Sequence, residues 1–152
     1  MLDDISDRCA AVEECYEFML AYAAQGLPSD QGSKSGGQVR EFLQRAVKAL
    51  TGLAEACTVA IKQEGLEPAH TYFAFFAVLD RDARDSLAAI ELVLAQSAIS
   101  SQVIDNLNAS IHLRALLTDL FLVDEIVRSQ DKGKTCRLGS NSTTPPAPTA
   151  RG

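Results

Sequence analysis

No part of this sequence alternates β-branched and polar residues over a useful length, so it lacks the pattern of a half-buried strand. It also lacks an apolar run of the roughly 18 residues that a membrane-spanning helix needs. The most apolar stretch, residues 111–127, is interrupted by charged residues, namely Arg114, Asp119, Asp124 and Glu125. The first residues, Met-Leu-Asp-Asp, are acidic where a secretory signal would be basic. Together these absences predict an all-α, cytoplasmic protein without a membrane partner.

The short motifs of common helical enzymes are also missing. A di-iron bundle needs Glu-x-x-His on two of its helices, but only Glu67 and His70 have this spacing, because Ala109 stands three residues before His112. No two cysteines have the C-x-x-C spacing of a redox site. No elbow motif surrounds a candidate hydrolase nucleophile. We therefore predict no catalytic residue, no metal site and no cofactor.

The 4 cysteines could form two disulfides, but their positions argue against pairing. Cys9 and Cys57 lie at apolar positions of helical patterns, and Cys15 belongs to the same helical segment as Cys9. Cys136 lies in the polar C-terminal region. We predict that the first three are core or near-core thiols and that Cys136 is a free, exposed thiol.

Charge is unevenly distributed around a net value of −6. Residues 131–152 hold one acidic and four basic residues, so they carry +3 and residues 1–130 carry −9. An acidic body disfavours nucleic acid as a partner. From Thr135 onward Ser, Thr, Pro and Gly dominate, a composition that cannot bury enough apolar surface to fold. We predict a flexible tail over residues 134–152.

Apolar residues recur with the helical period in four segments, and turn-forming residues fill the longest connection, 26–37. The short connection around Ile99 makes the last two segments antiparallel neighbours. The predicted fold is an antiparallel four-helix bundle over residues 1–133. Its helices are expected at about residues 3–24, 38–63, 68–97 and 101–130.

The helix predicted over 68–97 has two apolar sides. A broad core-like face contains Tyr72, Phe75, Phe76, Leu79, Ala83, Leu87, Ile90 and Leu94. The opposite side carries smaller apolar residues, interrupted by the charged run 80–85, and these are Ala74, Ala77, Ala88, Leu92 and Ala95. A helix with one buried side should have a charged outer face. We therefore predict that this helix is covered on both sides, in a homodimer that buries it together with the helix over 101–130.

A charged cluster is the candidate binding site. If the last two predicted helices are antiparallel, residues whose numbers sum to about 199 lie level. This register places Asp85 near Arg114, and Asp80 or Arg81 near Asp119. The candidate ligand-binding or partner-binding residues are Phe73, Arg81, Arg84, Asp85, His112, Arg114 and Asp119.

Two interpretations of this cluster remain open. In one, its basic residues bind an anionic ligand or a partner's carboxylates. In the other, Asp80 pairs with Arg84 and Arg81 pairs with Asp85 on a solvated helix surface, each pair contributing a few tenths of a kcal/mol.

The absence of catalytic motifs and the surplus of apolar helix surface favour a non-enzymatic interaction protein. It would act as a homodimeric adaptor, assembly factor or regulatory module. One alternative is a ligand-sensing bundle that binds a small anionic or aromatic molecule. A second is a metal-dependent helical enzyme, whose ligands would be Glu67, His70, Glu13, Glu14 and Glu17.

Overall fold

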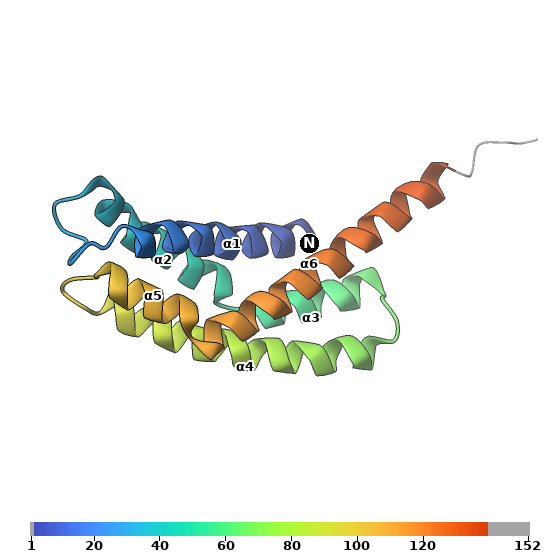
Figure 1. Cartoon of the computed structure of the whole chain (residues 1–152). Helices are drawn as coiled ribbons and strands as arrows, with labels where there is room; N and C mark the ends of the chain where they lie inside the picture. The colour runs from blue at the N-terminus through green and yellow to red at the C-terminus, as the bar shows by residue number, and fades with distance from the viewer. Residues whose placement is uncertain (1, 140–152) are drawn as a thin grey trace, which may run out of the picture.

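The computed structural model describes residues 2–139, and within them every regular element is a helix (Figure 1). The all-α prediction is confirmed, but this part of the chain contains six helices where four were predicted. They are α1 (Leu2–Ala24), α2 (Lys34–Leu50), α3 (Leu53–Glu64), α4 (Ala69–Leu94), α5 (Ser101–Ala109) and α6 (Ile111–Gly139).

The helix predicted over 38–63 is broken between α2 and α3. Gly52 stands at the break in the left-handed region, with φ of 74°. Glycine adopts this conformation without the steric cost that a Cβ imposes. The backbone N–H of Thr51 still donates to the Val47 carbonyl, which closes the last turn of α2. Gly52 therefore ends one helix and begins another, and the prediction of one continuous helix was wrong.

The helix predicted over 101–130 is also broken, at Ser110. This residue is extended, with ψ of 140°. Its hydroxyl accepts a hydrogen bond from the backbone N–H of Leu113 at 3.3 Å, so Ser110 caps the start of α6. Serine is tolerated inside helices as well as at their ends, and so the sequence pattern gave no sign of this break.

The C-terminal helix is longer than predicted. α6 continues to Gly139, and Lys134 forms an ion pair with Glu64 of α3. This contact ties the later part of α6 to the rest of the protein. Residues 134–139 are therefore helical, contrary to the predicted tail, and the remainder of that predicted tail, 140–152, lies outside the described residues.

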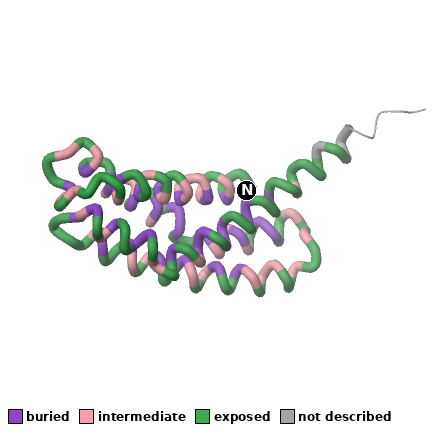
Figure 2. Tube along the Cα trace, viewed as in Figure 1, coloured by how far each residue is buried: buried purple, intermediate pink, exposed green. Residues whose placement is uncertain are grey.

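The core is built around α1, which packs against α2, α3, α5 and α6. Its buried side chains recur every three or four residues and include Ile5, Cys9, Val12, Cys15, Met19 and Tyr22. Figure 2 shows buried and exposed residues alternating along α1 and α4. The thiols of Cys9, Cys15 and Cys57 are buried and that of Cys136 is exposed, so the prediction for the cysteines is confirmed. Burial raises the pKa of each of the three buried thiols to about 12.

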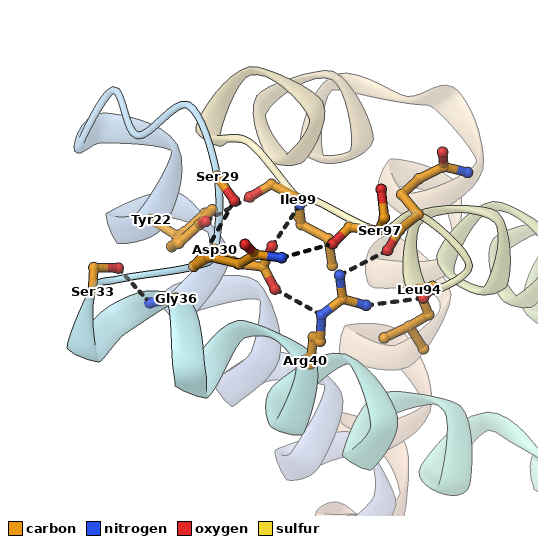
Figure 3. A network of polar contacts seen from close by, with 11 residues as sticks. Tyr22, Ser29, Asp30, Ser33, Gly36, Arg40, Leu94, Ser97 and Ile99 are labelled. Carbon is orange, nitrogen blue, oxygen red and sulfur yellow. Dashed lines mark hydrogen bonds and ion pairs between the residues drawn. The ribbon is translucent and has the colours of Figure 1, made fainter.

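The long connection between α1 and α2 is held in place by Asp30 (Figure 3). One carboxylate oxygen accepts from the Ile99 N–H at 2.7 Å, and the other accepts from Arg40 Nε at 2.7 Å. Arg40 also donates to the carbonyl oxygens of Leu94 and Gln96, at 3.0 and 2.7 Å. Burial alone would raise the pKa of Asp30, but the hydrogen bonds from Ile99 and Arg40 outweigh it and lower this pKa.

We call this set of contacts the Asp30 latch. It joins the connection that precedes α2 to the connection between α4 and α5. The connection between α1 and α2 also forms a backbone hydrogen bond with the start of α5, since the Ser101 N–H donates to the Leu27 carbonyl at 2.8 Å. These contacts therefore hold the connection between α1 and α2 against the connection between α4 and α5.

Candidate functional site

An apolar groove opens between α3, α4 and α6. α4 and α6 meet where the Ser86 hydroxyl donates to the His112 carbonyl at 3.0 Å, and they diverge toward the start of α4 (Figure 1). The space between them has a volume of about 460 Å³. Its lining residues are Ile61, Leu66, Pro68, Thr71, Tyr72, Phe75, Phe76, Leu122, Val123, Ile126, Val127, Ser129 and Gln130.

The walls of the groove have different origins. Tyr72, Phe75 and Phe76 come from the first turns of α4 and give one wall an aromatic surface. Leu122 and Ile126 come from the α6 wall and remain 49% and 36% exposed. Large apolar side chains left accessible beside a concave surface are typical of binding sites for ligands or partner segments.

Two carboxyl groups, Asp82 on α4 and Asp119 on α6, are placed along their helices between the Ser86–His112 contact and the first residues that line the groove. Asp119 is only 8% exposed and precedes Leu122 and Val123 by about one turn of α6. Its Oδ2 atom is buried and has no hydrogen-bond partner within residues 2–139. The carboxyl of Asp82 lies beside it, and the two groups can share a hydrogen bond when Asp119 carries a proton. We call Asp82 and Asp119 the acid pair.

The environment of the acid pair changes the protonation of Asp119. Burial, the hydrogen bond that protonated Asp119 can share with Asp82 and repulsion by the Asp82 charge raise the pKa of Asp119 to about 7. Near neutral pH this carboxyl is therefore partly protonated. The acid pair thus combines a carboxyl that can donate a hydrogen bond with a neighbouring carboxylate, and neither residue is among those that line the groove.

The outer side of α4 is a second exposed apolar surface. All five small apolar residues predicted on this side are exposed, and Leu92 reaches 66%. Val78 on α4 and Ile111 at the start of α6 are also accessible, at 40% and 75%. Within residues 2–139 of a single chain, therefore, α4 buries one side only, and the other described helices do not supply the expected cover over its second side.

The predicted charged cluster does not converge into one site. Arg84 is exposed and pairs with Asp80 at 2.8 Å, as the solvated-surface interpretation expects. Phe73 is half-buried, with Lys62 Nζ of α3 lying 5.8 Å from its ring centroid. Arg81, Arg114 and His112 are exposed, whereas Asp119 is buried.

The predicted register is close to the observed one, but the partners differ. Asp85, expected near Arg114, has its Oδ2 atom 4.0 Å from His112 Nδ1. Asp119, expected opposite Asp80 or Arg81, meets Asp82 instead. Successive residues are rotated by about 100° around the axis of a helix. A register estimated from sequence therefore cannot determine which side chain faces the neighbouring helix. Sequence reasoning therefore missed both the groove and the acid pair.

Two residues of the metal-enzyme alternative are engaged elsewhere. A carboxylate oxygen of Glu67 accepts from the Ala69 N–H at 3.0 Å, at the start of α4. Glu14 of α1 pairs with Arg45 at 3.0 Å. Across residues 2–139 the structure gathers no group of three or more His, Cys, Asp or Glu side chains suited to a metal ion.

Comparisons with family models, with curated proteins and with solved structures found no match to this chain. Over the described residues, none of the helices has both the length and the apolar character required to cross a bilayer.

Proposed function

We propose that this chain is a non-enzymatic interaction protein, a homodimeric adaptor, assembly factor or regulatory module whose groove binds a helical segment of a partner protein. The observation that carries the proposal is the apolar groove itself, with Leu122 and Ile126 accessible on its α6 wall. Helix-in-groove recognition uses this kind of surface, with apolar anchors spaced three or four residues apart. In this proposal α2 with α3, and α5 with α6, form two broken members of an antiparallel four-helix bundle.

The dimensions of the groove suit a short helical segment. Its α6 wall runs from Leu122 to Gln130, which spans roughly 12 Å at 1.5 Å per residue. That length matches about two turns of a partner helix. Asp119 of the acid pair lies about one turn of α6 before Leu122. We therefore expect the best partner segment to carry a basic residue about one turn from its apolar anchors, on the side of Asp119.

A photo-crosslinking experiment tests partner binding in the groove. When p-benzoylphenylalanine replaces Leu122, we expect irradiation of the cells that express the variant to give discrete crosslinked protein adducts. These adducts should disappear when Ile126→Glu is also introduced. The matched control carries the same group at Leu20, an exposed residue of α1 outside the groove. Equal adducts at both positions, or adducts that survive Ile126→Glu, contradict the proposal.

A ligand-sensing role is the second candidate, and the groove volume favours it. About 460 Å³ falls in the range of small-molecule pockets, roughly 300–1,000 Å³. The aromatic wall suits an apolar or aromatic ligand. An anionic ligand fits less well, because the lining contains no basic residue and the exposed Arg81, Arg84 and Arg114 do not line the groove. Native mass spectrometry tests this role. A small molecule that stays bound to the wild type and is absent from the Ile126→Glu variant would favour ligand sensing over partner binding.

The homodimer belongs to the same proposal and uses a different side of α4. By helical geometry, the exposed Ala77 and Ala88 are turned well away from Tyr72 and Phe75 of the groove. A dimer formed through the outer side of α4 therefore leaves both grooves open to partners.

A further inference from the structure

The outer side of α4 has the spacing of a helix-packing seam. Six of its residues follow one another at alternating intervals of four and three, and every one of them is exposed in the single chain. This period of 3.5 residues keeps a line of side chains facing a second helix. The six residues, which we call the α4 seam, are Ala74, Val78, Arg81, Asp85, Ala88 and Leu92.

The α4 seam is complementary to itself when its direction is reversed. We infer that α4 packs against α4 of a second copy in the opposite direction, with a two-fold axis level with Ala83. Ala74 then faces Leu92 of the partner subunit, Val78 faces Ala88 of the partner subunit, and Arg81 faces Asp85 of the partner subunit. A two-fold axis generates each of these contacts twice. The inference rests on the homodimer proposed above and specifies its interface.

Each of the three kinds of contact is favourable. The two apolar contacts join a small side chain to a larger one, so the helices can approach without leaving a gap. Leu92 and Val78 are 66% and 40% exposed in the single chain, and packing removes their apolar surface from water. The central contacts join opposite charges, which fix direction and register.

Other arrangements of the same two helices lose this complementarity. A parallel pair would bring Arg81 against Arg81 and Asp85 against Asp85, and such like-charge contacts are destabilising. An antiparallel pair shifted by one heptad in either direction would place Arg81 against Val78 or against Leu92. Each shift leaves the charges facing apolar residues, which costs free energy of desolvation without an ionic partner. Only the arrangement centred on Ala83 satisfies all six positions.

Charge reversal tests the register. Arg81→Glu should weaken the dimer about tenfold or more, because the introduced carboxylate would face Asp85 of the partner subunit, and Asp85→Lys should weaken it similarly. An equimolar mixture of the two variants should recover wild-type affinity as a heterodimer, because both of its central contacts again join opposite charges. Arg84→Glu is the matched control, since Arg84 is an exposed residue of α4 outside the seam. The readout is the dimer dissociation constant from sedimentation equilibrium.

Disulfide trapping tests the direction independently. In a Cys136→Ser background the remaining native thiols are buried. A mixture of Val78→Cys and Ala88→Cys chains should then crosslink to each other under mild oxidation, and Val78→Cys chains alone should not. Crosslinking of Val78→Cys alone would show a parallel pair and overturn the inference.

The outcomes separate this inference from the broader proposal. A wild-type dimer that is indifferent to both charge reversals overturns the α4 seam as the interface while the homodimer stands. A monomeric wild type overturns both the homodimer and the α4 seam as its interface. Partner binding in the groove is tested separately, by the crosslinking experiment at Leu122.

Discussion

At the scale of single residues, Asp119 is a carboxyl whose pKa lies near neutral pH. Its pKa is raised from an ordinary value of 3.8 to about 7, first by burial and then by Asp82. The folded chain therefore holds a proton that the unfolded chain releases at lower pH. The stabilisation from protonated Asp119 is fully present below about pH 4. It is lost as the pH rises from about 4 to about 7. Above about pH 7 the titration of Asp119 no longer changes the free energy of unfolding.

The substitution Asp119→Asn removes this titration. We expect the free energy of unfolding at pH 8 to rise by about 1–3 kcal/mol, because a neutral amide no longer places a second negative charge beside Asp82. Urea unfolding at pH 5 and pH 8 measures the difference. Asp105→Asn, at an exposed position of α5, is the control and should keep the wild-type pH dependence. An Asp119→Asn profile as steep as that of the wild type would contradict the assignment.

At the scale of elements, the Asp30 latch depends on a close approach at Gly36 of α2. A Cβ atom there would lie 1.9 Å from the Asp30 carbonyl oxygen, so the connection would have to move and its hydrogen bonds would be disturbed. We expect Gly36→Ala to lower the free energy of unfolding by about 2–3 kcal/mol.

The neighbouring glycine is the matched control for this prediction. Gly37 lies in the same helix, and a Cβ there would meet nothing within 4 Å. Gly37→Ala should leave stability unchanged or raise it by about 0.5–1 kcal/mol, because alanine favours helix. Both variants are measured by urea unfolding, and equal effects at the two positions would show that the latch does not require the close approach.

The sequence predicted elements better than it predicted their breaks. Apolar periodicity located α1 and α4 to within a few residues, because each is a long amphipathic helix with one buried side. Gly52 carried a signal for a break, since glycine is the residue that tolerates a left-handed backbone, but a single glycine is also tolerated inside a helix at a cost of about 1 kcal/mol. Ser110 carried none. The groove could not be foreseen, because it depends on how far α4 and α6 diverge, and periodicity does not encode that angle.

At the scale of the whole molecule, two exposed surfaces of α4 suit two different associations. The groove is apolar, and we propose that it binds a helical segment of a partner protein. The α4 seam is a convex strip with opposite charges at its centre, and it suits a second copy of the same chain. A dimer formed through the seam would present two grooves, an arrangement suited to an adaptor that holds two partner segments together.

The solution mass from light scattering tests the central claim most directly. We expect a wild-type mass about twice the 16.3 kDa of the chain. We expect the Ala88→Glu variant to be a folded monomer with unchanged helix content, because its carboxylate would face Val78 of the partner subunit. A wild-type mass of 16.3 kDa at every concentration measured would contradict the homodimer. A dimer that persists in the Ala88→Glu variant would place the interface elsewhere on the molecule.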